Sequence, residues 1–285
     1  MGRMGEAMAR RIAAAGHGLV IWNRTRAVAD EVASSLEGRA RVAASAAEAV
    51  ATADVVLSML ADGRSTCSVL LHDAVLAAYR PGVVVCDLAT SGPQAARELA
   101  ERLGEAGFAF VDAPVSGSVS AVAGGTLLVM AAGEPGDIEI LAPVLGSFAR
   151  KVVRVGDPGA GQAMKLAVNL IVHGLNSSLS EALVMATTAG VTRDEAYDVF
   201  QESVIAAPFV NYKRGAFTDE TTPVAMSLAL VLKDLGLITD FAADAKVPIT
   251  ATEAVRDQVR QACEAGFGER DMAALSWFLG LNVAQ

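Results

Sequence analysis

The chain has 285 residues, of which 53% are hydrophobic and 19% are charged, and its formal net charge at pH 7 is −9. This length is sufficient for two domains with a sizeable core. An acidic chain is a poor ligand for nucleic acid, so we expect none, and a small anionic ligand would need a local basic site. No apolar run reaches the ~18 residues that suggest a membrane span, so we expect no membrane partner.

The three cysteines are far apart and odd in number: Cys67, Cys86 and Cys263. This spacing argues against a disulfide framework and against a metal-binding knuckle, so no metal ligands are assigned. The N-terminus is amphipathic and lacks the charged and then apolar blocks of a signal peptide. We therefore expect a cytoplasmic location.

The first 18 residues predict a glycine turn that opens a helix. Gly2 and Gly5 have the spacing of the last two glycines of the dinucleotide-binding sequence G-x-G-x-x-G. Backbone at Gly2 could approach a pyrophosphate, and Gly5 would let the helix pack close to a sheet. We therefore assign Gly2, Arg3 and Met4 to cofactor binding.

The first glycine of that fingerprint and the strand before it are absent from the sequence. That strand lies in the middle of the sheet in dinucleotide-binding folds, so its absence would expose two strand edges. We expect that residues upstream of Met1 are missing, and that cofactor binding depends on them.

A short apolar strand at 19–22 ends in Asn23-Arg24-Thr25, where such folds contact the adenosine ribose. An acidic side chain at this place favours NAD, whereas a guanidinium suits the 2′-phosphate of NADP. The sequence therefore predicts NADP, with NAD still possible. The alternative is that these three residues form only a polar turn with a helix cap.

Strands and helices alternate along the first half of the chain. This alternation predicts a Rossmann-type, doubly wound and mostly parallel sheet, whose ligands bind at the carboxyl ends of the strands. Leu60, Thr90 and Ser116 all fall at such ends. The expected strands are 42–43, 55–60, 83–87, 108–112, 125–133 and 151–155, and the expected helices between them include 27–36, 46–52, 64–79 and 138–145.

No strand pattern follows Gly161, and residues 156–161 are rich in glycine. We therefore predict a dinucleotide-binding domain at 1–156 and an all-helical domain for substrate binding and dimerisation at 157–285. A long helix over about 160–190 would join them. The other helices are expected at 192–202, 224–243, 249–265 and 271–278.

Lys165 and Asn169 interrupt the apolar pattern of the long helix one turn apart, so they project from the same side. Such a pair either caps or solvates the helix, or works in a cleft. His173 lies one further turn along, and we interpret it as a core or interface residue.

The order of these features resembles the beta-hydroxyacid dehydrogenase family, which includes 3-hydroxyisobutyrate, glyoxylate and succinic semialdehyde reductases. Four blocks carry the resemblance and span almost the whole chain: Gly2 to Ala9, Asp112-Ala-Pro-Val-Ser-Gly117, the spacing Gly159-x-Gly161-x-x-x-Lys165-x-x-x-Asn169, and Lys233-Asp-Leu-Gly-Leu237.

The resemblance implies reversible hydride transfer between NAD(P) and a small hydroxy acid or an aldehyde or keto acid. It implies that Lys165 is the catalytic lysine and that Asn169 holds the reacting oxygen or orients the lysine. It further implies that Ser116, Gly117 and Ser118 bind the substrate carboxylate. Lys233 would lie near the nicotinamide and the substrate, and Leu60, Ala61 and Thr90 would contact the cofactor.

Two departures from the family pattern bear on the substrate. Leu170 stands where relatives often have a second asparagine, and the substrate loop reads Ser-Gly-Ser where many have Ser-Gly-Gly. By resemblance, this loop and Asn-Arg-Thr favour the NADP-dependent semialdehyde and glyoxylate reductases. Imine reductases share the fold but usually lack a lysine at position 165, so they are the lesser alternative.

A catalytically silent scaffold that uses the fold for dimerisation is the alternative from another class, because the fingerprint is truncated. The wide apolar stripes of the predicted helices also suggest burial by a partner subunit. We therefore expect a homodimer or homotetramer.

Overall fold

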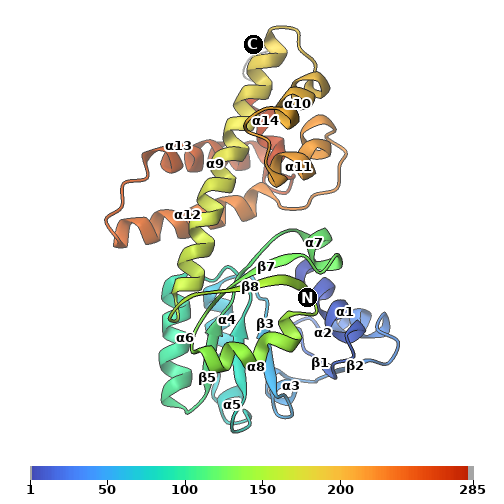
Figure 1. The fold of residues 1–285 in the computed structure, drawn as a ribbon, viewed down its shortest axis with the longest axis vertical. Helices are drawn as coiled ribbons and strands as arrows, with labels where there is room; N and C mark the ends of the chain where they lie inside the picture. The colour runs from blue at the N-terminus through green and yellow to red at the C-terminus, as the bar shows by residue number, and fades with distance from the viewer. Residues whose placement is uncertain (1, 282–285) are drawn as a thin grey trace. The chain divides into compact units, whose positions relative to one another are not determined.

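The computed structural model describes residues 2–281, coloured from blue to red along the chain in Figure 1. The chain divides into two compact units, Met1–Lys165 and Leu166–Gln285. Unit 1 contains every strand of the part of the chain that the structure describes, and unit 2 is helical. This is the predicted combination of a Rossmann-type domain with an all-helical domain.

Unit 1 begins with a small α/β segment that has its own two-stranded sheet. β1 and β2 pair in parallel, with Leu19 opposite Ala40 and Ile21 opposite Val42. The elements are α1 (Arg3–Ala14), β1 (Leu19–Ile21), α2 (Arg26–Ser34), β2 (Ala40–Val42) and α3 (Ala46–Val50).

The remaining strands of unit 1 form a six-stranded mixed sheet in the order β3-β4-β5-β7-β6, with β8 paired to β7. β3, β4 and β5 run parallel, so that Ser58, Asp87 and Asp112 lie in register at their carboxyl ends. β7 runs antiparallel to β5 and β6, and parallel to β8. The strands are β3 (Val55–Ser58), β4 (Val84–Asp87), β5 (Ala109–Asp112), β6 (Val115–Ser116), β7 (Leu127–Ala132) and β8 (Ala149–Gly156).

Within residues 2–281, the two sheets of unit 1 are separate. Among the described strands, β1 pairs with β2 alone and β3 with β4 alone. Each sheet therefore presents one strand edge that a central strand would cover.

Five helices cover the six-stranded sheet and its neighbouring loops: α4 (Gly63–Leu70), α5 (Asp73–Leu76), α6 (Pro93–Glu105), α7 (Val119–Ala123) and α8 (Pro135–Leu145). The prediction of one helix over 64–79 was wrong. α4 ends at Leu70, and the Nδ1 atom of His72 accepts a hydrogen bond of 3.2 Å from the amide of Ala74, which starts α5. A side chain that accepts from the backbone two residues later favours a helix start over helix continuation.

Alternate residues of the segment formed by β4 and Val83, the residue before it, are buried against opposite layers of unit 1. Val84 and Cys86 contribute to one cluster, whereas Val83 and Val85 contribute to another, and all four are at most 2% exposed. Because successive side chains of a strand point to opposite faces, this burial requires helices on both faces of the sheet. It is the physical basis of the doubly wound architecture.

Unit 2 is built on the long helix α9 (Ala160–Thr188), the yellow-green helix of Figure 1, whose first turns belong to unit 1. α10 begins with a reciprocal capping box between Thr192 and Glu195, as its sequence suggests. The other helices are α10 (Arg193–Glu202), α11 (Pro208–Thr218), α12 (Leu228–Asp244), α13 (Thr250–Ala262), a π-helical segment Cys263–Phe267, a 3-10 segment Met272–Ala274 and α14 (Leu275–Leu281).

Two details of unit 2 differ from the sequence-based expectation. α12 begins at Leu228 and not at residue 224, because the Ser227 hydroxyl caps it by accepting from the amide of Leu230. α11 was not predicted, although its Pro208 at the first helical position was the available signal.

A buried ion pair fixes the loop that precedes α12. Lys213 Nζ lies 2.6 Å from Asp271 Oδ1, and both side chains are at most 8% exposed. Asp271 also accepts hydrogen bonds from the amides of Ala225, Met226 and Ala273. These bonds compensate for the cost of removing both charges from water.

No helix among residues 2–281 combines the length and the apolar character needed to cross a membrane.

The first turn of α9 has no room for a side chain at Gly161. A Cβ atom there would lie 2.6 Å from Asp112 Oδ2 and 2.7 Å from the Met130 carbonyl oxygen, whereas one at Gly174 would meet nothing within 4 Å. Gly161→Ala should therefore lower the free energy of unfolding by about 1–3 kcal/mol, as overpacking does. Gly174→Ala, on the same helix, should leave it unchanged or raise it by up to about 1 kcal/mol. Urea denaturation of both variants measures this, and equal effects would contradict the packing argument.

Candidate active site

The loops that follow the parallel strands of unit 1 emerge at one edge of the sheet. Leu60 and Ala61 follow β3, and Thr90 follows β4. Ser116 lies at the end of β6, which continues from β5 through Ala113 and Pro114. Because Ser58, Asp87 and Asp112 are in register, the residues after them share the edge where α/β proteins bind ligands.

The N-terminus of α1 fits the phosphates of a dinucleotide. Gly2 is its N-cap in an extended conformation (φ −80°, ψ 171°), with no side-chain cap and with open space around its Cα. Helix N-termini without a side-chain cap offer amide donors and a partial positive charge to an anion. Arg3 is exposed and Met4 packs toward the core, so Arg3 is the neighbour suited to solvent-borne phosphate.

The loop after β1 contains no acidic side chain between residues 22 and 25. The side-chain amide of Asn23 donates a 2.8 Å hydrogen bond to the Thr25 carbonyl, which folds the loop, and Arg24 is exposed. Thr25 is the N-cap of α2 but makes no side-chain capping bond. Thr25 therefore occupies the N-cap position without capping through its side chain. The exposed guanidinium of Arg24 makes the loop cationic.

The Ser116–Ser118 loop depends on the glycine between its two serines. Gly117 has φ +133°, and a Cβ atom there would lie 2.6 Å from a methyl carbon of Leu127. The hydroxyls of Ser118 and Ser120 lie 2.7 Å apart at the start of α7. Hydroxyls grouped with backbone amides around a left-handed glycine form a concavity suited to an anion.

Asp112 at the end of β5 fixes the beginning of α9. Its two carboxylate oxygens accept hydrogen bonds from the amides of Gly159 (3.0 Å) and Gln162 (2.8 Å). An acid at a helix N-terminus satisfies amides that have no partner within the helix and interacts favourably with the helix dipole. Burial nevertheless raises the pKa of Asp112 to about 6, because desolvation outweighs these two bonds.

Gln162 joins the same turn of α9 to the loop after β4. Its Oε1 atom accepts from the amides of Ser91 (3.0 Å) and Gly92 (3.1 Å), and its Nε2 atom donates to the Ala89 carbonyl (2.9 Å). Thr90 therefore lies between two residues that Gln162 holds. Lys165 follows three residues later on α9 and is partly exposed.

In unit 2, Asp234 is a buried carboxylate surrounded by predicted site residues. Its Oδ2 atom accepts a 2.8 Å hydrogen bond from the side-chain amide of Asn169, and its Oδ1 atom lies 3.3 Å from Lys233 Nζ. Lys233 is 29% exposed and Asp234 is 7% exposed at the side chain. The buried carboxylate of Asp234 therefore holds the partly exposed ammonium group of Lys233 at the surface of unit 2.

His173 lies one turn beyond Asn169 and is only 1% exposed. Its Nε2 atom is 3.8 Å from Asp234 Oδ2, beyond a normal hydrogen bond. Within residues 2–281, neither nitrogen of its ring has a hydrogen-bond partner. His173 is thus a core residue of unit 2, as interpreted from the sequence.

Comparison with known proteins agrees with these features over nearly the whole chain. Residues 1–156 match the NAD binding domain of 6-phosphogluconate dehydrogenase, and residues 159–279 match the NAD-binding domain of NADP-dependent 3-hydroxyisobutyrate dehydrogenase. The chain belongs to the beta-hydroxyacid dehydrogenase family. It is an NAD(P)-dependent oxidoreductase that acts on hydroxy acids or the corresponding oxo acids.

Three relatives illustrate the range of this family. Glyoxylate/succinic semialdehyde reductase 1 of Arabidopsis thaliana is 28% identical over 96% of this chain and 94% of its own length. L-threonate dehydrogenase of Cupriavidus necator is 32% identical over 84% of this chain and 82% of its own. The structure of 3-hydroxyisobutyrate dehydrogenase from Mycobacterium tuberculosis with L-serine aligns with a TM-score of 0.85 at 30% identity, covering 98% of this chain and 96% of its own.

Imine reductases are more distant from this beta-hydroxyacid dehydrogenase. The structure from Pseudomonas aligns with a TM-score of 0.63 at 23% identity, over 98% of this chain and 96% of that one, which indicates a shared fold. The hydroxy-acid enzymes therefore outrank the imine reductases, as the lysine at position 165 suggested.

Sequence reasoning missed three buried polar residues that bond to predicted site residues or to the segments that carry them. Asp112 and Asp234 stand inside the quoted motifs but were given no role, and Gln162 was read as part of the long helix. The available signal was the occurrence of polar residues within apolar segments: Asp112 ends an apolar strand, and Gln162 and Asp234 stand in mostly apolar helices. All three are at most 5% exposed, and such groups are buried only when hydrogen-bonded.

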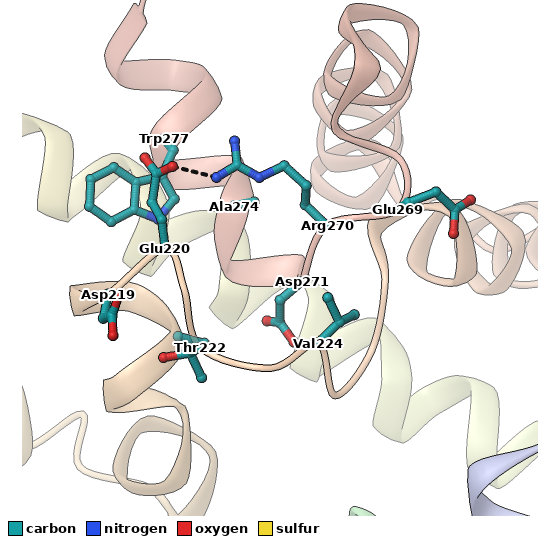
Figure 2. A pocket seen from close by; sticks show the side chains of 10 residues that line it. Asp219, Glu220, Thr222, Val224, Glu269, Arg270, Asp271, Ala274 and Trp277 are labelled. Carbon is teal, nitrogen blue, oxygen red and sulfur yellow. Dashed lines mark hydrogen bonds and ion pairs between the residues drawn. The ribbon is translucent and has the colours of Figure 1, made fainter.

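A pocket in unit 2 has no part in the predicted site. Figure 2 shows it lined by Asp219, Glu220, Arg270, Asp271 and Trp277 among others, with the ion pair between Glu220 and Arg270 at its rim. Asp271 is committed to Lys213 and to the backbone. The pocket coincides with none of the residues assigned from the sequence.

The raised pKa of Asp112 predicts a pH dependence of stability. Folding raises the pKa of this carboxyl from 3.8 to about 6, so its protonated form favours the folded state. This contribution to the free energy of unfolding is complete below pH 3.8 and is lost as the pH rises through 6. Wild type should therefore lose about 2–3 kcal/mol relative to Asp112→Asn between about pH 4 and pH 7. Urea denaturation across this range measures the difference. Asp54→Asn, which removes an exposed carboxylate, serves as the control, and a pH-independent difference would contradict the assignment.

Proposed function

We propose that this enzyme transfers hydride between NADP(H) and a short carboxylic acid bearing an aldehyde, keto or hydroxyl group, with Lys165 as the general acid and base. The observation that carries the proposal is the position of Lys165 on α9. It lies about one turn after Gln162, whose amide donates to Asp112, and it has the family's spacing to Asn169. The glyoxylate, semialdehyde and threonate relatives share this substrate chemistry, since each name describes a small acid with an oxo or hydroxyl group.

The preference for NADP(H) rests on the loop after β1. Arg24 is exposed there, and an acidic side chain that would accept from both ribose hydroxyls is absent between residues 22 and 25. A guanidinium can bind a 2′-phosphate with two parallel hydrogen bonds, whereas it adds little for an unphosphorylated ribose. Gly2 and Arg3 would bind the pyrophosphate, and Leu60, Ala61 and Thr90 the remainder of the cofactor.

When bound, the nicotinamide supplies the hydride for reduction and accepts it for oxidation. Lys165 donates a proton to the substrate carbonyl oxygen during reduction, and as a neutral amine it removes the hydroxyl proton in the reverse direction. Lysine suits both directions because its pKa falls readily when its charged form is desolvated.

A hydrogen bond to Asp234 sets the orientation of the Asn169 side-chain amide. Its nitrogen donates to Asp234, so its Oδ1 atom is oriented as an acceptor. An acceptor one turn from Lys165 can receive a hydrogen bond from the ammonium group or from the substrate hydroxyl. We infer that Asn169 orients the proton donor and that Asp234 orients Asn169.

The substrate carboxylate would bind the Ser116, Gly117 and Ser118 loop, and Lys233, which matches a family lysine, is the cation assigned to the same substrate. The loop offers hydroxyl and amide donors, and Lys233 remains partly exposed although it is paired with Asp234. These groups recognise any short acid. They explain how one scaffold in this family accepts glyoxylate, succinic semialdehyde or threonate in different members.

We further propose that the domains act as predicted, 1–156 for the cofactor and 157–285 for substrate and dimer contacts, and that the enzyme is cytoplasmic. The three free cysteines Cys67, Cys86 and Cys263 support a reducing compartment. Large apolar side chains on four helices of unit 2 support a homodimer or homotetramer, since each is at least half exposed: Ile171, Met185, Val199, Tyr212 and Leu230.

Lys165→Met should lower kcat by about 10²–10⁴-fold with glyoxylate or succinic semialdehyde, because the proton donor is lost while the volume is kept. NADPH oxidation in steady state measures this. The dissociation constant for NADPH should stay within about threefold of wild type. Lys151→Met, which changes an exposed lysine of β8, should be fully active. Substantial activity in the Lys165 variant would disprove the catalytic assignment.

Arg24→Ala should raise the KM for NADPH by about tenfold or more and leave the KM for NADH nearly unchanged, since the lost contact concerns the 2′-phosphate. Parallel kinetics with both cofactors measure the ratio. Arg10→Ala, which removes an exposed arginine paired with Glu6, is the matched control. Equal losses for both cofactors would refute the preference for NADP.

The mass in solution, measured by light scattering after gel filtration, should be at least twice the 29.3 kDa of the chain. Ile171→Asp should reduce that mass if the exposed face of α9 is an interface, because a charge is costly in a buried apolar contact. A wild-type protein that elutes with the mass of one chain would exclude the proposed assembly.

A further inference from the structure

Gln162 is buried completely, although glutamine is usually a surface residue. It stands in the first turn of α9, between Gly161, which has no room for a side chain, and the turn that carries Lys165. Both polar atoms of its side chain, Oε1 and Nε2, form hydrogen bonds with backbone groups of residues 89–92.

The three hydrogen bonds bracket Thr90. Gln162 accepts from the amides of Ser91 and Gly92 at 3.0 and 3.1 Å and donates to the carbonyl of Ala89 at 2.9 Å. A side-chain amide that pairs with backbone on both sides of a residue fixes the loop much as a neighbouring strand would. Gln162 thus holds the backbone on both sides of Thr90.

The loop has a second anchor on the side of β4. Ser91 Oγ donates to Asp87 Oδ2 at 2.6 Å, and the other oxygen of Asp87 accepts from Ser58 Oγ at 2.7 Å. Asp87 and Ser58 are buried, so these bonds are shielded from competing water. The loop is therefore tied to the sheet by Asp87 and to α9 by Gln162.

We propose that Gln162 is a positioning residue of the reaction, which couples the turn of α9 that carries Lys165 to the cofactor loop that carries Thr90. The inference rests on the proposed function, because it takes Lys165 as the proton donor and Thr90 as a cofactor contact. In physical terms, the Gln162 side chain sets the distance between the turn that carries Lys165, the proton donor, and the loop that carries Thr90. Losing it lets both elements shift, and misplacement of about 1 Å can cost 10²-fold in rate.

Gln162→Met tests the proposal, because it keeps the length of the side chain and removes all three hydrogen bonds. We expect kcat/KM for NADPH to fall about 10- to 100-fold, through both a higher dissociation constant for NADPH and a lower kcat. Leu141→Ala is the stability control: Leu141 is fully buried in α8 of the same unit and has no place in the site. The melting temperatures of both variants are measured in the absence of cofactor.

A double-mutant cycle separates positioning from general support of the fold. If Gln162 acts through the loop, Thr90→Ala should cost clearly less in the Gln162→Met background than in wild type, since coupled residues are not additive. Additive losses, or kinetic constants in Gln162→Met no worse than in Leu141→Ala, would overturn the proposal. Should Gln162→Met fail to fold, Gln162→Glu replaces it. That variant keeps both acceptor bonds and sets an acceptor against the Ala89 carbonyl, and wild-type affinity for NADPH in it would also overturn the proposal.

Fluorescence titration with NADPH keeps this test distinct from that of the function itself. NADPH binding requires no chemical step, so a wild type that binds NADPH with a Gln162→Met variant that binds equally well refutes the positioning role alone. A wild type with neither NADPH binding nor reductase activity refutes the proposed function, and the positioning role with it.

Discussion

A single buried carboxylate fixes the start of the long helix α9, which carries the proposed proton donor Lys165. Asp112 ends a central strand and accepts from the amides of Gly159 and Gln162, so the first turn of α9 is held directly at the carboxyl edge of the sheet. Hydrogen bonds to a charged acceptor contribute about 1.5–3 kcal/mol each, more than neutral ones. Desolvation of the carboxylate opposes this stabilisation and raises the pKa of Asp112. Because an α-helix turns by a constant angle per residue, fixing its first turn also fixes the direction in which its later side chains project.

Glycine and buried polar side chains act together at this point. Gly161 lets α9 approach Asp112 and the Met130 carbonyl, and Gln162 then reaches the loop after β4. Neither residue could replace the other: the first supplies close approach, and the second supplies paired donors and acceptors. Unit 2 repeats the principle with Asp234, whose carboxylate sets the amide of Asn169 and pairs with Lys233. In both units, a buried acid orients a neutral amide.

The strands of unit 1 that the structure describes form two sheets. β1 and β2 keep the parallel pairing and the cationic loop expected of a dinucleotide-binding half, although they form a sheet of their own. Burial of both faces of β4 shows that the other half is held by helices on each side.

The sequence by itself determined the fold class, the family and the identity of the motifs, because each rests on local signals. Apolar runs of strand length alternate with helical periods, and Lys165 and Asn169 are four residues apart whatever surrounds their helix. Only the tertiary structure decided the partners of buried polar groups. Asp112 meets Gln162 across 50 residues of chain, and Asp234 meets Asn169 across 65. No periodicity encodes such pairings, because they arise when distant segments exclude water together and each buried donor must find an acceptor.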